Sequence, residues 1–291
     1  MKLLRRMLTR LRHQLRSPRQ FYSPVVNPYD PRVLRTVSEQ ATAILPDAED
    51  LIIDDDTLIE SLKQIARFYP EMRFPGPRDG KSRYFFENAM FSYGDAIPLF
   101  GMIRSRRPGR IIEVGCGYSS ALLMDINDVF FAREIELTFI DPYPATLMSL
   151  LRGDDEYYRS RVTQRPLQEI PTDVFTKLQA NDLLLLDSSH VSKVASDVND
   201  YFFRILPALA PGVLVHVHDI FYPFEYPQAW VIDDGRSWNE AYLLRAFLQY
   251  NDRFKIVYFN DYMHRRFGNL LKAYLPVCAE NGGGGIWLEK T

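Results

Sequence analysis

The sequence predicts an α/β fold, with a mostly parallel sheet of seven strands, helices on both faces and an antiparallel strand at one edge. Two observations predict it. From about residue 91 onward, short apolar runs alternate with segments of helical periodicity. Several of these runs end in an acidic residue, which is typical of strands whose carboxyl ends form a binding edge. Such an arrangement is called Rossmann-like.

The first strand and its following turn are the most informative segment. Residues 111–119 read Ile-Ile-Glu-Val-Gly-Cys-Gly-Tyr-Ser, an apolar run that contains the acid Glu113. Gly115 permits a sharp turn, and Gly117 lets a ligand approach the backbone without meeting a Cβ. A helix is expected over Ser119–Asp125. Together these parts predict a cradle for a nucleotide-type cofactor, with Glu113 hydrogen-bonded to a polar group of that cofactor.

The type of cofactor depends on the residue after the glycines. A dinucleotide fingerprint needs glycine or alanine three positions after its second glycine, and this chain has Ser120 there. A pyrophosphate also favours a bare helix N-terminus, whereas Glu113 suits a cationic or amino-bearing ligand. An NAD-type oxidoreductase is therefore the less favoured alternative.

Four further strands are expected to bring polar residues to the same edge of the sheet. Asp141 ends the second strand, 24 residues after Gly117, which is near the spacing at which a carboxylate meets ribose hydroxyls. The expected strands and their polar ends are 135–141 with Asp141, 161–166 followed by Gln168, 182–186 followed by Asp187, and 213–217 followed by His218 and Asp219.

The remaining elements suggest three regions. Residues 1–32 combine a basic amphipathic helix with a proline-rich linker, residues 33–90 form a helical N-terminal extension, and residues 91–291 form the main domain. The expected helices span 33–43, 56–69 and 96–105, the last with Asp95 as its N-cap. Two late strands, 255–259 and 285–289, lack a full crossover helix between them, which predicts the antiparallel edge.

Composition and charge narrow the class of protein. The 291 residues are 46% hydrophobic and 25% charged, which is ordinary for a globular protein, and no apolar run is long enough to span a bilayer. Cys116 and Cys278 provide neither a disulfide framework nor a metal knuckle, so we expect a cytoplasmic protein. Cys116 is expected to be a small side chain that fits the turn rather than a reactive thiol.

The first 20 residues carry seven Lys or Arg and no acid, whereas the other 271 hold 28 bases against 37 acids. Their apolar residues recur at helical spacing, so this segment could contact an anionic inner-membrane surface, the acidic body or a partner chain. Nucleic acid is not an expected partner, because the body is acidic. The oligomeric state is left open by the sequence.

Histidines and acids near the last strand ends are the candidates for chemistry. His190 lies three residues after Asp187 and is suited to accept a hydroxyl proton near neutral pH. Asp187, His218 and Asp219 could converge on one divalent cation, such as Mg²⁺, or serve only as hydrogen-bond acceptors. His216 and His218 share one strand face, and His216 is interpreted as a buried, hydrogen-bonded histidine.

Several of these segments together resemble a known family. The acid-x-Gly-x-Gly-x-Ser arrangement resembles motif I of the class I S-adenosylmethionine (SAM) methyltransferases. Residues 85–291 resemble, more narrowly, the bacterial family that includes macrolide-sugar O-methyltransferases and cephalosporin-hydroxylase-like proteins. The segments that carry this resemblance are Phe91–Asp95, Glu113–Ser119, Asp187–His190 and Gly212–Asp219.

The resemblance implies a SAM-binding domain over 91–291 and O-methylation of a small-molecule hydroxyl, such as that of a sugar or glycan. It implies His190 as base and Asp187 as a metal ligand, and this chain has His218-Asp219 where the family has an acidic pair. A non-catalytic binding or scaffold subunit is the alternative. The residues implied to bind SAM are Glu113, Gly115, Gly117, Tyr118, Ser119, Asp141 and Gln168.

Overall fold

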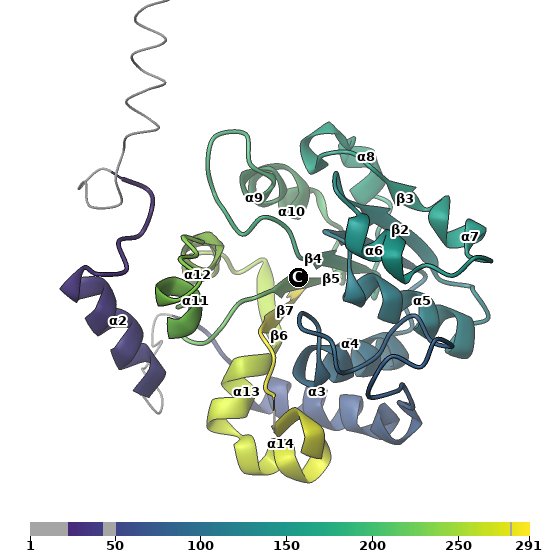
Figure 1. The fold of residues 1–291 in the computed structure, drawn as a ribbon, viewed down its shortest axis with the longest axis horizontal. Coiled ribbons are helices and arrows are strands. Elements are labelled where there is room, and N and C mark those ends of the chain that lie inside the picture. The colour runs from purple at the N-terminus through teal and green to yellow at the C-terminus, as the bar shows by residue number, and fades with distance from the viewer. Residues whose placement is uncertain (1–22, 43–50, 280) are drawn as a thin grey trace, which may run out of the picture.

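The computed structural model describes residues 23–42, 51–279 and 281–291. The sequence prediction of a basic helix concerns the first 20 residues, which lie outside the described part of the chain. Seven strands form one sheet in the order β3-β2-β1-β4-β5-β7-β6 (Figure 1). Their bounds are Arg110–Val114 (β1), Glu136–Ile140 (β2), Val162–Thr163 (β3), Leu183–Leu186 (β4), Leu214–His218 (β5), Phe254–Phe259 (β6) and Gly285–Lys290 (β7).

The sheet confirms the predicted fold class. Strands β1 to β5 pair in parallel, and β7 runs antiparallel to both of its neighbours, β5 and β6. The antiparallel strand therefore lies one place inside the edge strand β6. Strand β4 is the four-leucine run Leu183–Leu186 and is fully buried, because both faces of a central parallel strand are covered.

Helices cover both faces of the sheet (Figure 1). The longer ones are α2 (Pro31–Thr42), α3 (Asp55–Phe68), α4 (Tyr93–Arg106), α5 (Tyr118–Phe130), α12 (Glu240–Gln249), α13 (Asn260–Arg266) and α14 (Gly268–Tyr274). The shorter α-helices are α6 (Ala145–Leu150), α7 (Glu156–Arg159), α8 (Thr172–Phe175), α9 (Asp197–Asp200), α10 (Leu206–Ala208) and α11 (Gln228–Ile232). Three 3₁₀-helices span Tyr69–Glu71, Leu167–Glu169 and Pro276–Ala279. A π-helix spans Tyr201–Ile205.

The prediction that Asp95 caps α4 was wrong. The helix begins earlier, with Ser92 as N-cap, so Asp95 lies inside the first turn. Its buried carboxylate accepts a hydrogen bond from the backbone N–H of Gly284, 2.8 Å away. The Asp95 carboxylate therefore accepts from a backbone N–H near the far end of the chain, and not, as the sequence predicted, from an N–H of its own helix.

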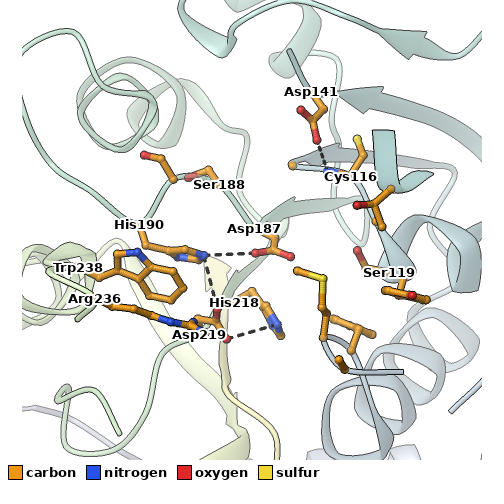
Figure 2. A pocket seen from close by; sticks show the side chains of 18 of the residues that line it. Cys116, Ser119, Asp141, Asp187, Ser188, His190, His218, Asp219, Arg236 and Trp238 are labelled. Carbon is orange, nitrogen blue, oxygen red and sulfur yellow. Dashed lines mark hydrogen bonds and ion pairs between the residues drawn. The ribbon is translucent and has the colours of Figure 1, made fainter. Parts of the chain in front are cut away.

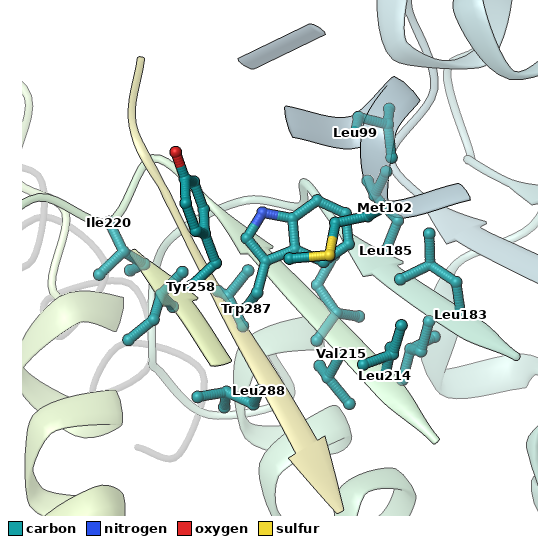
Figure 3. Packing of buried hydrophobic residues seen from close by; sticks show 14 of the residues in the cluster. Leu99, Met102, Leu183, Leu185, Leu214, Val215, Ile220, Tyr258, Trp287 and Leu288 are labelled. Atoms are coloured by element: carbon teal, nitrogen blue, oxygen red, sulfur yellow. The ribbon is translucent and has the colours of Figure 1, made fainter. Parts of the chain in front are cut away.

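The hydrophobic core surrounds the central strands. Trp287 of β7 has no solvent exposure and packs near Met102 of α4, Leu185 of β4 and Val215 of β5 (Figure 3). This packing fixes the antiparallel strand against the parallel ones and so holds the carboxyl ends of β4 and β5 side by side. Within the described residues, no helix is both long and apolar enough to cross a membrane.

Candidate active site

The turn after β1 has the geometry that its glycines predict. Gly115 has a φ of +83°, and a Cβ there would lie 1.6 Å from the carbonyl oxygen of Asp187. Only glycine satisfies both constraints. Gly117 has extended backbone, and a Cβ there would meet only Thr146, at 3.7 Å. The fold itself therefore tolerates a larger residue at 117, and the space beside Gly117 remains open for a ligand.

Two cavities meet over this turn. One has a volume of about 430 Å³ and is lined by Gly117, Tyr118 and Ser119, and the other has about 470 Å³ and is lined by Gln168. Asp141, Asp187 and Gly115 line both. The expected cofactor-binding residues of the turn, of the end of β2 and of the segment after β3 therefore surround one continuous groove.

Asp141 is held at the junction of the two cavities. Its carboxylate accepts hydrogen bonds from the backbone N–H of Cys116, at 2.9 Å, and of Tyr143, at 2.6 Å. Gln168 instead donates its side-chain N–H to the carbonyl of Ala195, at 2.7 Å. Burial raises the pKa of the Cys116 thiol well above its usual value, as expected for a side chain that only fills the turn.

Glu113 does not lie where the sequence predicted. It is fully buried beneath the turn, lines neither cavity, and accepts a short hydrogen bond from the Ser120 hydroxyl. Its other carboxylate oxygen has no partner among the described residues. Burial raises the pKa of Glu113 to about 8. Glu113 therefore supports the turn from below.

Acidic and imidazole groups converge at the ends of β4 and β5 (Figure 2). One ligand atom from each of Asp187, His218 and Asp219 lies within 4.8 Å of the others, so the structure brings the three predicted metal ligands together. His218 Nε2 lies 3.5 Å from an oxygen of Asp219. Although burial opposes it, the nearby His218 and His190 rings lower the pKa of Asp187. Two carboxylates and an imidazole are a donor set that fits a divalent cation.

His190 lies between carboxylates on both sides of its ring. Its Nε2 is 3.4 Å from Asp187 and 3.5 Å from Asp219, and its Nδ1 is 2.7 Å from Glu240. Burial alone would lower the pKa of His190, but its contacts with Asp187 and Glu240 raise it well above the usual value. The ring also packs against Trp238, with centroids 4.2 Å apart and the ring planes tilted by 34°.

Backbone strain accompanies these positions. His190 and Asp219 both have a backbone φ of +58°, which residues other than glycine rarely adopt. The carbonyl of His190 accepts hydrogen bonds from the N–H groups of Asn239 and Glu240 at the start of α12. The N–H of Asp219 donates to the carbonyl of Gly284 at 2.7 Å. Strained residues held by such contacts are typical of functional sites.

Glu240 is a residue that sequence reasoning missed. It is 1% exposed, lies 50 residues after His190, and also accepts a short hydrogen bond from the Tyr201 hydroxyl. An acid at the start of a helix is an ordinary feature, so nothing local indicated its partner. The expected hydrogen bonds of His216 were also wrong: among the described residues, neither of its ring nitrogens has a partner. It packs on Trp287 instead, and burial lowers its pKa.

Comparisons with known proteins identify the family. Residues 112–220 match the model of a methyltransferase domain. An uncharacterized protein from Archaeoglobus fulgidus is 31% identical over 168 residues, which cover 56% of this chain and 74% of that protein. The chain therefore carries a methyltransferase domain over residues 112–220.

Solved structures of more distant proteins are also similar. The O-methyltransferase TomG from Streptomyces achromogenes, solved with SAM, is 17% identical with a TM-score of 0.37, covering 83% of this chain and 91% of its own. CalS11, a TDP-rhamnose 3'-O-methyltransferase, is 13% identical with a TM-score of 0.35, covering 65% and 88%. Similarity at this level says nothing about the acceptor.

Proposed function

We propose that the chain transfers a methyl group from SAM to a hydroxyl of a small polar acceptor, with His190 as the base. The observation that carries this proposal is the position of His190 Nε2, which faces the cavity edge between Asp187 and Asp219 at 3.4 and 3.5 Å. Glu240 holds the opposite nitrogen, Nδ1, at 2.7 Å. A base needs one ring nitrogen fixed and the other available to the substrate. Glu240 fixes Nδ1, and Nε2 becomes available once the charges of Asp187 and Asp219 are offset.

The residues divide the task as follows. Asp141 and the backbone around Gly117 would bind and orient the cofactor, whose methyl group is already activated by its sulfonium. Transfer would form the bond between the acceptor oxygen and the methyl carbon and break the carbon–sulfur bond, and His190 Nε2 would take the hydroxyl proton. Alignment of oxygen, carbon and sulfur could supply on the order of 7–11 kcal/mol of the barrier reduction.

We extend the proposal to a divalent cation held by Asp187, His218 and Asp219. Three surrounding carboxylates favour the protonated imidazole of His190, which cannot act as a base. A cation held by Asp187 and Asp219 would offset two of these charges and would also lower the pKa of an acceptor hydroxyl. The close approach of the three donor atoms, within 4.8 Å, supports this role.

Calorimetric titration with SAM, S-adenosylhomocysteine and NAD, with and without Mg²⁺ or Mn²⁺, tests the cofactor and the metal together. We expect micromolar binding of both adenosyl ligands, no binding of NAD, and a separate metal titration that Asp219→Asn abolishes. Binding of NAD instead would favour the oxidoreductase. Absence of all binding would favour a scaffold subunit. A metal titration that survives Asp219→Asn would contradict the cation site.

A further inference from the structure

A second cavity, of about 420 Å³, adjoins the active site. It shares Asp219 and Trp230 with the cavity over the glycine turn, so the two spaces meet beside the proposed base. Its other walls include Asp95, Phe221 and Asp261. A glycine run near the C-terminus forms one side of this space.

The glycine run 282–285 is required by close packing against this cavity. Gly283 has a φ of +68°, and a Cβ there would lie 2.4 Å from the carboxylate of Asp95. A Cβ on Gly284 would lie 2.4 Å from the ring of Phe221. The backbone of Gly284 donates to Asp95 at 2.8 Å and accepts from the N–H of Asp219 at 2.7 Å. The run therefore fixes the carboxylate of Asp95 and the backbone of Asp219 in place.

The charge of the lining favours some ligands over others. Three carboxylates line the cavity, from Asp95, Asp219 and Asp261, whereas His264 is the single basic side chain that the described residues contribute. Asp261 already pairs with Arg265 at 2.7 Å, but Asp95 is 93% buried and has no basic partner within ion-pair distance in the described part of the chain. The unpaired Asp95 carboxylate would repel an anionic group placed here, while hydroxyl or ammonium groups could donate to its oxygens.

The remaining walls suit a ring. Phe221 and Trp230 form an apolar corner, with ring centroids 5.2 Å apart, and His264 has a buried Nδ1 that makes no hydrogen bond to any described residue. A pocket that combines aromatic surface with several hydrogen-bonding groups is typical of a small-molecule site.

We propose that this second cavity holds the body of the methyl acceptor, and that it accepts an uncharged or amine-bearing sugar ring and excludes an anionic one. The inference rests on the proposed function, since it places the acceptor hydroxyl beside Asp219 and His190. Asp95 is the specificity-determining residue, because its carboxylate is fixed by Gly284 and faces the space that the ring occupies.

The test uses three probes of equal size and different charge: p-nitrophenyl glucoside, glucosaminide and glucuronide, each titrated into the protein with S-adenosylhomocysteine present. We expect the first two to bind and the glucuronide to bind at least tenfold more weakly. Asn281→Trp should fill the rim of the cavity and weaken glycoside binding at least tenfold, with unchanged affinity for S-adenosylhomocysteine.

Asn251→Trp is the matched control. Like Asn281, Asn251 caps a backbone N–H two residues later, at 3.0 Å against 3.1 Å, but it lies on the turn before β6. Equal binding of the glucuronide, absence of any glycoside binding, or equal loss in both tryptophan variants would overturn the acceptor cavity. Each of these outcomes leaves S-adenosylhomocysteine binding intact. Loss of that binding in the unmodified protein would instead remove the proposed function.

Discussion

His190 is the residue on which the proposed chemistry depends most directly. We expect His190→Gln to lower kcat by ~10²–10⁴-fold, because glutamine cannot accept the hydroxyl proton. The Kd for SAM should stay unchanged, since the cofactor-binding residues are elsewhere in the groove. Glu240→Gln should cost less, about tenfold, because the amide oxygen can still accept from Nδ1. Steady-state kinetics and calorimetry measure both, and a His190→Gln variant with full activity would exclude the base role.

The buried carboxyl of Glu113 makes the free energy of unfolding depend on pH. Its pKa is about 8 in the folded protein, against an ordinary value of 4.5, because it is buried. Between these values the folded state keeps a proton that the unfolded state loses, so this carboxyl destabilises the fold as pH rises from about 4.5 to about 8. The slope approaches roughly 1.4 kcal/mol per pH unit.

We therefore expect Glu113→Gln to gain stability relative to the unmodified protein between pH 5 and pH 8. Urea unfolding at a series of pH values measures the difference. Glu134→Gln, at an exposed position just before β2, is the control and should leave the profile parallel to that of the unmodified protein. A parallel profile for Glu113→Gln as well would mean that Glu113 is ionised in the folded state.

At the scale of elements, the two glycines of the β1–α5 turn have different roles: Gly115 is needed for folding, and Gly117 leaves room for the ligand. Gly115→Ala places a Cβ 1.6 Å from the Asp187 carbonyl and forces a strained φ, so we expect several kcal/mol of destabilisation. Gly117→Ala meets only ordinary contact and should fold normally, with weaker SAM binding. Thermal unfolding and SAM titration of the pair distinguish the two roles. Normal SAM affinity in Gly117→Ala would show that the ligand does not approach the backbone there.

At the scale of the whole molecule, Arg83 joins segments that are distant in sequence. Its fully buried guanidinium pairs with Asp125 at 2.6 Å, Asp128 at 2.9 Å and Asp155 at 2.5 Å. It thereby anchors the chain that leads to residues 89–91, which line the active-site cavity.

Loss of this arginine leaves the buried carboxylate of Asp125 without a counter-charge, while Asp155 keeps only the more distant Arg152, at 3.6 Å. We expect Arg83→Met to lower the free energy of unfolding by about 3–5 kcal/mol and to weaken SAM binding as well. Arg78→Met, at an exposed position five residues earlier, should change neither. Chemical denaturation and calorimetry give both quantities. Unchanged stability in Arg83→Met would show that the carboxylates are protonated or hydrated instead.

The acids of the binding edge could be predicted from the residues alone. Acids that end parallel strands reach the same edge of a sheet, so the strand pattern was enough to place Asp141, Asp187 and Asp219 together. The glycine pattern likewise identified the turn at Gly115, because its backbone conformation excludes a side chain. These features are local, since each depends on one strand and the few residues that follow it.

The contacts of individual side chains depend instead on tertiary packing. Glu113 turns beneath the loop because the strand directs it into the core, Asp95 bonds to Gly284 rather than capping its helix, and Glu240 reaches His190 across 50 residues. Such pairings depend on how helices and loops pack over the sheet edge, and packing is set by contacts between segments that no single stretch of sequence contains.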